Sequence, residues 1–430
     1  MFLKKSTALK GTIKVPGDKS ISHRAIMLGS LGKGPTEISN FLQGADCLST
    51  ISCFQKLGVQ IENRGNVVQI QGLGLHGLKS PQGVLDVGNS GTTARLLSGI
   101  LAGQKFCSTI NGDASIQQRP MNRIIEPLSQ MGSRLESLSK KDCAPLRIFP
   151  SSLHGISYSS PVASAQIKSC ILFAGLYADG ITQVTEPYLS RNHTELMFRY
   201  FGIPLEAQET RVQLSCAKPF SGQKVVVPGD ISSAAYFMAA AAIVPNSEIC
   251  IQKVGINPTR DGILEVMKEM GAHITLENTG FISGEPVADV IVQSSSLRGV
   301  TIGGSLIPRL IDELPILAVL AAYAEGETII RDAQELKVKE SNRIDSMVYN
   351  LSLMGAQVEA TEDGMIIHGG KPLKGAFLPV KGDHRIAMSF AIAALAAEGE
   401  TTLDNYDCVT ISYPDFYRDL KSLQDCTPAG

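Results

Sequence analysis

The sequence predicts an α/β protein of two domains, each built from three copies of a strand–helix–strand–helix–strand–strand unit. Three observations lead to this prediction. The chain has 430 residues, more than one hydrophobic core usually serves. Strand-like segments that open on glycine recur about every seventy residues. Each of them precedes an apolar or small-residue stretch of helical length, and six such units fill the chain.

The first strand of each copy begins near a glycine, at Gly11, Gly83, Gly155, Gly222, Gly299 and Gly375. The following helix is apolar on nearly all sides, as in SAAYFMAAAAIV and RIAMSFAIAALAA, which predicts that it is buried. A turn then leads into the second strand, at Gly34, Gly103, Gly180, Asn246, Gly326 and Gly399.

An amphipathic helix comes next, and in five copies it ends at a glycine that suits the left-handed position after a helix: Gly58, Gly132, Gly202, Gly271 and Gly355. Two strands of alternating polarity close the unit, as in GAQVEA. In the sixth copy the helix DFYRDLKSLQ runs into the end of the sequence.

The two domain crossovers are expected at the closest pair of copies, KVPGDKSISHRA and VVPGDISSAAYF. Pro-Gly-Asp can serve there both as a hinge and as the cap of the next helix. We place the crossovers near Gly17 and Gly229. Residues 1–17 and 229–430 then form one domain, and residues 18–228 form a second, inserted domain, with the active site expected in the cleft between them.

Composition excludes several classes of protein. The net charge of -2 argues against a nucleic-acid or polybasic membrane protein. No apolar run reaches the roughly 20 residues that a bilayer requires, and we expect a cytoplasmic protein without an export signal. The nine cysteines form no C-x-x-C pair, and we interpret them as reduced core thiols.

Cations gather at the two junctions where a strand of the repeat leads into a helix. Helix N-termini favour anions, so a cleft lined by these junctions suits substrates with several negative charges. Surface salt bridges are the alternative for any single residue, but they do not explain why the whole set shares two junction types. The cations are Lys19, Arg24, Arg119, Arg191, Lys339, Arg343 and Arg385.

At this point the motifs resemble those of a known family, the 3-phosphoshikimate 1-carboxyvinyltransferases or EPSP synthases. The similar segments are PGDKSISHRA, GNSGTTARL, QQRPMNRIIEPL, SAQIKS, LKVKESNRI and GDHRIAM, and they span essentially the whole chain in order. The resemblance implies the enolpyruvyl transferase fold, with two inside-out α/β barrel domains of three βαβαββ repeats. It implies transfer of the enolpyruvyl group of phosphoenolpyruvate to the 5-hydroxyl of shikimate 3-phosphate, in the shikimate pathway of aromatic amino-acid biosynthesis.

The resemblance also assigns residues. Those similar to the family's shikimate 3-phosphate contacts are Lys19, Ser20, Arg24, Ser164, Ala165, Gln166, Arg191, Asp312 and Lys339. Those similar to the phosphoenolpyruvate pocket are Lys19, Gly91, Arg119, Gln166, Arg343 and Arg385. The implied catalytic residues are Asp312, Glu340 and Lys19. The resemblance implies no metal and no cofactor, and we expect a monomer.

The chemistry needs two carboxyl groups in different protonation states, because one accepts a proton from an alcohol while the other gives a proton to carbon. Asp312 and Glu340 are the candidates. For Asp312 the alternative is a first-turn acid that the helix dipole favours. For Glu340, between Lys339 and Arg343, the alternative is an ion pair on a helix surface.

The sequence disfavours three other functions. The sister family, which transfers the same group to a UDP-N-acetylhexosamine, typically has Lys-Asn in the first motif and a reactive cysteine where this chain has Ala114. An oxidoreductase is suggested by GLGLHG, but LKSPQG after it cannot open a helix, so a turn between antiparallel strands is favoured. A non-catalytic sugar-phosphate binder would be favoured only if Asp312 or Glu340 were absent.

The sequence departs from one common form of the family at three positions, Ser90, Ala165 and Ile411. The last stands where many members carry a lysine that reaches phosphoenolpyruvate. Gly91 is expected to line the pocket where a bulkier analogue such as the herbicide glyphosate binds in this family. The fourth copy offers no catalytic candidate beyond Arg260 and is expected to be mainly structural.

Overall fold

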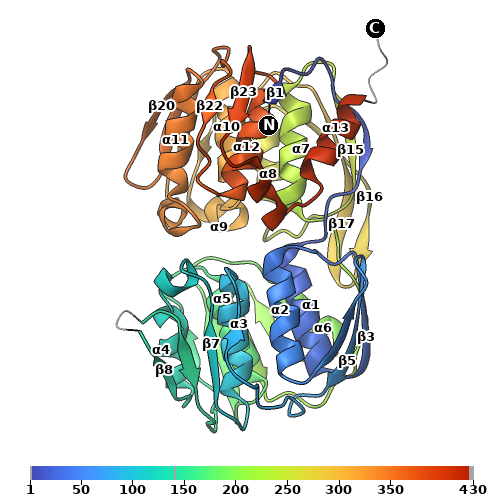
Figure 1. Ribbon diagram of the computed structural model, residues 1–430, viewed down its shortest axis with the longest axis vertical. Coiled ribbons are helices and arrows are strands. Elements are labelled where there is room, and N and C mark those ends of the chain that lie inside the picture. Colours follow the sequence, from blue (N-terminus) through green and yellow to red (C-terminus); the bar gives the residue numbers. More distant parts are fainter. Residues whose placement is uncertain (1, 140–141, 426–430) are drawn as a thin grey trace. The chain divides into compact units, whose positions relative to one another are not determined.

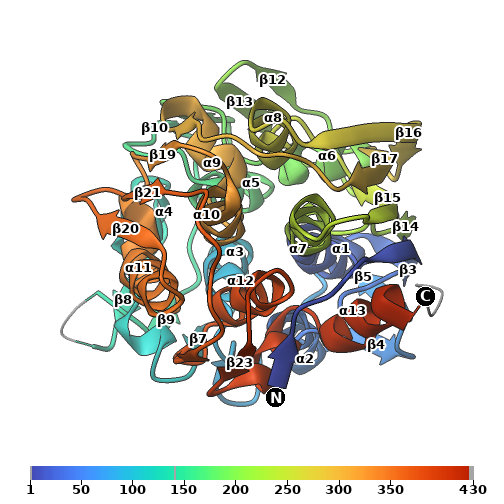
Figure 2. The same ribbon diagram turned by 90° about the horizontal axis from the view of Figure 1, so that it is seen from above.

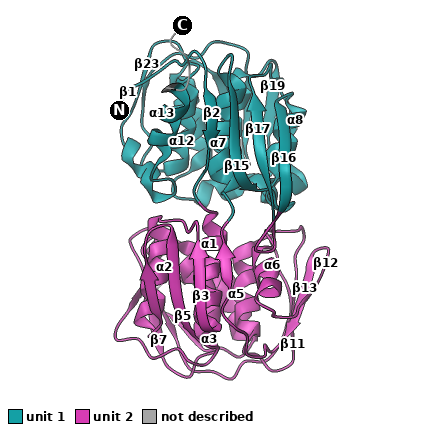
Figure 3. Ribbon diagram, turned by 90° about the vertical axis from the view of Figure 1, so that its right-hand side faces the viewer, with its two compact units in different colours: residues 1–16, 228–280, 286–430 teal, residues 17–227, 281–285 magenta. Residues whose placement is uncertain are grey.

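The computed structural model describes residues 2–139 and 142–425. The chain divides into two compact units (Figure 3). Unit 1 comprises residues 1–16, 228–280 and 286–430, and unit 2 comprises residues 17–227 and 281–285. The chain therefore leaves unit 1 after Pro16 and returns to it at Pro228, and the turn 281–285 groups with unit 2.

Unit 2 contains six α-helices and twelve strands among the described residues (Figure 1). The helices are α1 (Lys19–Leu31), α2 (Ala45–Lys56), α3 (Gly91–Ala102), α4 (Asn122–Gln130), α5 (Ala165–Gly175) and α6 (His193–Tyr200). The strands are β3 (Lys33–Ser39), β4 (Gln60–Asn63), β5 (Val67–Leu73), β6 (Leu85–Asp86), β7 (Ser108–Asn111), β8 (Leu135–Ser137), β9 (Leu146–Ile148), β10 (Ser157–Ser159), β11 (Ile181–Thr185), β12 (Glu206–Gln208), β13 (Arg211–Ser215) and β14 (Lys224–Val226).

Unit 1 holds the remaining described elements. Its helices are α7 (Ile231–Ile243), α8 (Gly262–Glu269), α9 (Ile307–Leu310), α10 (Leu314–Tyr323), α11 (Arg343–Leu353), α12 (His384–Ala394) and α13 (Phe416–Asp425). Its strands are β1 (Phe2–Lys4), β2 (Lys10–Ile13), β15 (Glu248–Gly255), β16 (His273–Ile282), β17 (Glu285–Gln293), β18 (Thr301–Ile302), β19 (Glu327–Ile330), β20 (Gln357–Ala360), β21 (Met365–His368), β22 (Phe377–Leu378) and β23 (Glu400–Leu403).

Each copy of the repeat contributes one small sheet, and the strand order is the same from copy to copy. In the second copy the order is β6-β7-β9-β8, with β6 parallel to β7 and the other pairs antiparallel. The third and fifth copies repeat this order as β10-β11-β13-β12 and β18-β19-β21-β20. The predicted α/β class and its repeating unit are thereby confirmed.

The first and fourth copies exchange their opening strands. The strand at Gly11, β2, pairs in parallel with β15 of the fourth copy. The strand after Gly222, β14, pairs in parallel with β3 of the first copy. The physical reason is that each crossover follows the strand, so the strand stays in one unit while its helix begins the other. In the sixth copy, β1 completes a three-stranded sheet beside β23.

The first helix of every copy is buried, as its composition predicted. In unit 1, α7, α10 and α12 pack against one another at the centre of the core (Figure 2). In unit 2, α3 and α5 approach so closely that a Cβ on Gly99 would lie 2.2 Å from the carbonyl oxygen of Cys170. Small residues allow three helices to share one core, while strands such as β5 alternate buried and exposed residues outside them.

The helix ends follow the predicted local chemistry. Asp18 Oδ1 accepts a hydrogen bond from Ile21 N (2.8 Å), and Asp230 Oδ1 accepts one from Ser232 N (3.2 Å), so both Pro-Gly-Asp motifs cap a helix. The five glycines predicted after the amphipathic helices all have φ between 78° and 95°. The segment GLGLHG forms no dinucleotide fingerprint, because Gly72 lies in β5 and the next helix begins only at Gly91. It is not a turn between two antiparallel strands either, because the following strand, β6, belongs to another sheet.

The interpretation of the cysteines as core thiols was wrong for two of them. Cys107 and Cys216 are exposed, and Cys250 is partly exposed. All eight cysteines in the described part of the chain are free thiols, and Cys426 lies outside the described residues. Among the described helices, none has the length and apolar character needed to cross a membrane.

Candidate active site

In unit 2, the candidate residues lie at or beside helix N-termini, as the repeat predicted. Ser164 is the N-cap of α5, where its side chain accepts from Ile167 N, and Ala165 and Gln166 form the first turn. Lys19 and Ser20 begin α1, and Gly91 begins α3. Arg191 lies just before α6 and Arg119 just after a short 3₁₀ turn. These positions offer backbone N–H groups and cationic side chains to an anion.

Arg24 lies deeper than expected for a substrate contact, because it is only 2% exposed. Its Nε donates to Thr194 Oγ1 (2.6 Å), its Nη2 to Ser169 Oγ (2.7 Å) and its Nη1 to the carbonyl oxygen of Ser20 (2.9 Å). Burial lowers the pKa of Arg24 to about 10, and Glu195 opposes this shift. Arg24 thus binds the first turn of α1 through the carbonyl oxygen of Ser20 and connects it to α5 and α6 through Ser169 and Thr194.

A buried lysine joins the same helices. Lys168 Nζ lies 2.9 Å from Glu186 Oε2 and 2.8 Å from Glu195 Oε1, and all three side chains are almost fully buried. Burial lowers the pKa of Lys168, but Glu195 and Glu186 outweigh it, so the pKa is raised. Glu186 also accepts from Ser164 N (2.9 Å) and Ser190 Oγ (2.9 Å). One carboxylate therefore connects the Ser164 cap to the loop that carries Arg191.

Gly91 lies against two guanidinium groups. A Cβ at this position would be 3.2 Å from Nη1 of both Arg119 and Arg95. Arg95 Nη1 donates to Gln166 Oε1 (2.5 Å), and Gln166 Nε2 donates to Thr92 Oγ1 (3.1 Å). The structure thus brings Gly91, Arg119 and Gln166 together and adds Arg95, which sequence reasoning missed although it lies in the quoted motif GNSGTTARL.

A buried hydrogen-bond chain links the first turns of α1 and α3 through α2. His23 Nδ1 lies 2.7 Å from Thr50 Oγ1, which lies 2.7 Å from Thr93 Oγ1, and Thr93 Oγ1 donates to Ser90 Oγ (2.7 Å). Burial lowers the pKa of His23 to about 3, although Asp46 opposes the shift. His23 therefore remains neutral in the folded protein at any pH near neutrality.

This shift predicts a pH-dependent loss of stability. The unfolded chain binds a proton at His23 near pH 6.5, whereas the folded chain does so only near pH 3. Stability from this residue is therefore complete above pH 6.5 and falls by about 1.4 kcal/mol per pH unit as the pH drops toward 3. Urea unfolding at pH 7, 6 and 5 gives the free energy of unfolding at each pH. This free energy should fall less steeply with decreasing pH in His23→Gln than in the wild type. The exposed His273→Gln should keep the wild-type slope, and an unchanged slope in His23→Gln would contradict the assignment.

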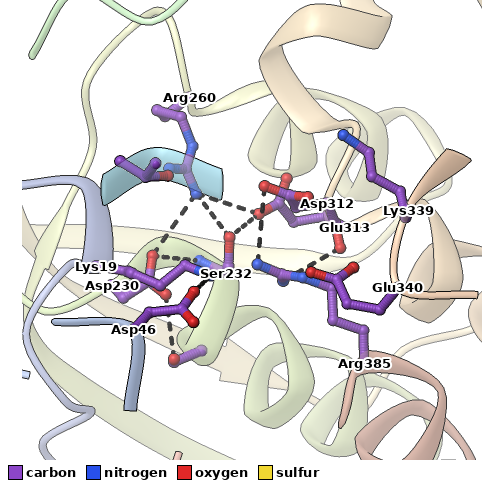
Figure 4. Close-up of polar contacts among 12 residues, drawn as sticks. Lys19, Asp46, Asp230, Ser232, Arg260, Asp312, Glu313, Lys339, Glu340 and Arg385 are labelled. Carbon is purple, nitrogen blue, oxygen red and sulfur yellow. Dashed lines mark hydrogen bonds and ion pairs between the residues drawn. The ribbon is translucent and has the colours of Figure 1, made fainter. Parts of the chain in front are cut away.

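In unit 1, the candidate residues form one compact cluster. Arg343, at the start of α11, lies 2.6 Å from Glu340 Oε2, 2.9 Å from Asp383 Oδ2 and 3.6 Å from Asp312 Oδ1. Arg385, at the start of α12, lies 3.7 Å from Asp312 Oδ2 (Figure 4). Asp312 lies between α9 and α10, and its carboxylate faces two guanidinium groups.

The charges of this cluster stabilise one another. Burial lowers the pKa of Arg343, but Glu340 and Asp383 outweigh it and raise the pKa. Burial likewise lowers the pKa of Arg385, and Asp312 raises it well above its ordinary value. Both guanidinium groups are therefore fixed positive charges at helix starts, suited to an anionic ligand.

Lys339 differs from the arginines because its pKa is lowered rather than raised. Desolvation lowers its pKa, and Asp312 and Glu335 only partly oppose this shift. The nearest carboxylate oxygen, Glu335 Oε1, is 3.7 Å from Lys339 Nζ. An ammonium group with a lowered pKa beside Asp312 can share in a proton transfer.

Two further residues of unit 1 were missed from the sequence. Asp383 is fully buried, and it caps α12 through Arg385 N (3.0 Å) while it also holds Arg343 Nε (2.9 Å). Its position before His384 in GDHRIAM signals a capping residue. Glu313 is buried beside Asp312, and no local sequence pattern indicates its contacts. Ile411, which stands where many members of the similar family carry a lysine, packs against the core of unit 1.

The described residues contain no group of three or more His, Cys, Asp or Glu side chains arranged for a metal ion. The site instead combines cations, two acidic groups of different exposure and helix N-termini. Asp312 is 16% exposed at its side chain and Glu340 28%. Such a set can hold anions and move protons between an alcohol and a carbon.

Comparison with known proteins gives a consistent result. Residues 3–420 match the family described as EPSP synthase (3-phosphoshikimate 1-carboxyvinyltransferase). A 3-phosphoshikimate 1-carboxyvinyltransferase of Thermoanaerobacter sp. (strain X514) is 57% identical over 98% of this chain and 99% of its own length. The 3-phosphoshikimate 1-carboxyvinyltransferase of Geobacillus kaustophilus (strain HTA426) is 54% identical over 97% of this chain and 98% of its own length. The solved structure of EPSP synthase from Acinetobacter baumannii superposes with a TM-score of 0.89 at 44% identity, covering 98% of both chains.

Proposed function

The chain belongs to the EPSP synthase family, and from this premise we propose how its two residue clusters divide the work of the reaction. The enzyme transfers the enolpyruvyl group of phosphoenolpyruvate to the 5-hydroxyl of shikimate 3-phosphate and releases phosphate. The oxygen of the 5-hydroxyl bonds to C2 of phosphoenolpyruvate while C3 gains a proton. C3 then loses a proton, the C2–O bond to phosphate breaks, and the double bond forms again.

The observation that carries our proposal is the cluster around Arg343. Asp312 lies between Arg343 and Arg385, whose charges favour its ionised form, as a base for the 5-hydroxyl requires. Lys339 contributes to the same proton transfer. Glu340 also pairs with Arg343, but its side chain is more exposed to solvent than that of Asp312. When phosphoenolpyruvate takes over the guanidinium of Arg343, Glu340 loses this ion pair and more readily carries the proton that C3 needs.

We assign the anion contacts by position. Lys19, Ser20, Ser164, Ala165, Gln166 and Arg191 hold shikimate 3-phosphate, with Arg24 beneath them and Asp312 and Lys339 at the hydroxyl. Gly91, Arg119, Gln166, Arg343 and Arg385 hold phosphoenolpyruvate, and Lys19 reaches both substrates. The fixed cations stabilise the charge that develops as phosphate leaves. In this proposal both clusters act on one bound pair of substrates.

Phosphate release by the purified protein tests the function. Phosphoenolpyruvate with shikimate 3-phosphate should give release, and phosphoenolpyruvate with a UDP-N-acetylhexosamine should not. Release with the UDP-sugar alone would refute the assignment. It would also favour the sister enzyme, despite Ala114 in place of its reactive cysteine.

Arg24→Ala should mainly weaken the binding of shikimate 3-phosphate. The variant loses the charged hydrogen bonds that hold Ser20, Ser169 and Thr194, each worth about 1.5–3 kcal/mol, so KM for this substrate should rise about tenfold or more. Its kcat at saturation should change much less, because Arg24 does not touch the reacting atoms. Steady-state kinetics would show the split. Arg64→Ala, which removes an exposed pair with Glu62, is the control. A loss in kcat alone would contradict the role.

We further propose a cytoplasmic monomer. One chain supplies both clusters and two hydrophobic cores. The eight described cysteines are free, as is usual for proteins in a reducing compartment. Light scattering after gel filtration would measure the mass, and a value near twice 45.9 kDa would contradict the proposed monomer.

A further inference from the structure

Glu313, the neighbour of Asp312, turns its carboxylate into the interior of unit 1. The residue is 1% exposed. Ser232 Oγ donates a short hydrogen bond to Glu313 Oε1, and Arg260 Nη2 lies 3.3 Å from the same oxygen (Figure 4). The side chain does not cap the helix that begins beside it. A buried carboxylate that lost its ion pair and hydrogen bond would be costly in free energy. These two contacts therefore hold the Glu313 side chain in one orientation.

Both partners of Glu313 come from the fourth copy of the repeat. Ser232 lies in the first turn of α7, and Arg260 lies in the loop before α8. Arg260 Nη2 also donates to Ser232 Oγ (2.6 Å) and lies 3.6 Å from Asp230 Oδ1, the cap of α7. The two junctions that carry substrate contacts in other copies are thus joined here into one buried network around Glu313.

Asp312 has partners of its own. Its carboxylate oxygens face Arg343 and Arg385, and its own carbonyl oxygen accepts from Arg385 Nη1 (3.3 Å). Between α9, a helix of four residues, and α10 the chain is not regularly helical. Two adjacent residues that are each held by their own partners leave the connecting peptide little freedom to rotate.

We propose that Glu313, held by Arg260 and Ser232, is a positioning residue that sets the orientation of the Asp312 carboxylate in the reaction. The fourth copy then acts on catalysis without touching a substrate. This inference rests on the role proposed above for Asp312. A misplacement of about 1 Å at a reacting group can cost about a hundredfold in rate, so the loss of one anchor should be visible in kcat.

The test compares Glu313→Ala with Glu313→Gln in the full-length enzyme. Glu313→Ala should lower kcat about tenfold or more and leave both KM values within about twofold, because the substrates do not contact this residue. Glu313→Gln keeps the shape and an acceptor for Ser232 and Arg260, so it should retain kcat within about threefold. Ser232→Ala, a milder change, should fall between them and serves if Glu313→Ala does not fold.

Arg309→Ala is the matched control. The Arg309 guanidinium binds Asp261, Glu265 and the carbonyl oxygen of Pro258 rather than Glu313, and its loss should leave kcat unchanged. A folded Glu313→Ala with wild-type kcat would overturn the proposal, as would equal losses in Glu313→Gln and Glu313→Ala. Asp312→Asn separates the two hypotheses. If that variant retains activity, the role of Asp312 fails, and if it is inactive while Glu313→Ala is not, only the positioning role fails.

Discussion

Asp312→Asn should lower kcat by at least about a hundredfold while KM for both substrates stays within about threefold. A positioned general base contributes about 10²–10⁴ to the rate, and the amide cannot accept the proton of the 5-hydroxyl. The amide keeps the size of the side chain, so the packing around Arg343 and Arg385 changes little. Initial rates of phosphate release over a range of both substrates would measure the two parameters separately.

Asp345→Asn provides the control for this variant. Asp345 is an exposed carboxylate in the first turn of α11, hydrogen-bonded by the Asn342 cap, and lies outside the arginine cluster. Its kcat should remain near the wild-type value. A rise in KM with unchanged kcat in Asp312→Asn would show that Asp312 binds substrate without acting as the base.

Lys168→Met should have the largest effect on stability. The variant leaves Glu186 and Glu195 buried without their cation, and breaking a buried ion pair in this way costs about 3–5 kcal/mol. Urea unfolding followed by circular dichroism would show the loss as a lower midpoint. KM for shikimate 3-phosphate should rise as well, because Glu186 holds the N–H of Ser164.

A second substitution checks the cause. Lys168→Met combined with Glu195→Gln removes one of the two unpaired charges, so the double variant should recover part of the lost stability. Lys56→Met, which changes an exposed lysine of α2, should cost little. If the double variant is less stable than Lys168→Met alone, the loss does not arise from unpaired carboxylates.

Helix caps and the backbone conformation of glycines after helices could be predicted from the sequence. Asp18 and Asp230 cap helices, and Gly58 and its equivalents adopt positive φ, because these features depend on a few neighbouring residues. The repeat placed Lys339, Arg343 and Arg385 at its two strand-to-helix junctions, whereas Asp312 and Glu340 were assigned from the resemblance to the family.

Contacts between distant segments could not be predicted in the same way. Lys168 lies in an apolar helix, and nothing in SAQIKS shows that Glu186 and Glu195 will face it. Arg24 has the position of a substrate contact, yet its hydrogen bonds go to Ser169 and Thr194. Placing the crossovers near Gly17 and Gly229 separated β2 and β14 from their own helices, but it did not identify β15 and β3 as their partner strands.

The exchange of β2 and β14 sets the order in which the enzyme can be completed during synthesis. β1 and β2 leave the ribosome first, but their partners β23 and β15 come much later in the chain. At about 5–20 residues per second, β1 waits roughly 20–80 s for β23. Unit 2 can form all its sheets as soon as β14 has emerged. A tag or truncation at the N-terminus therefore acts on two strands that must wait for later segments, and we expect it to reduce the yield of folded protein more than one at the C-terminus.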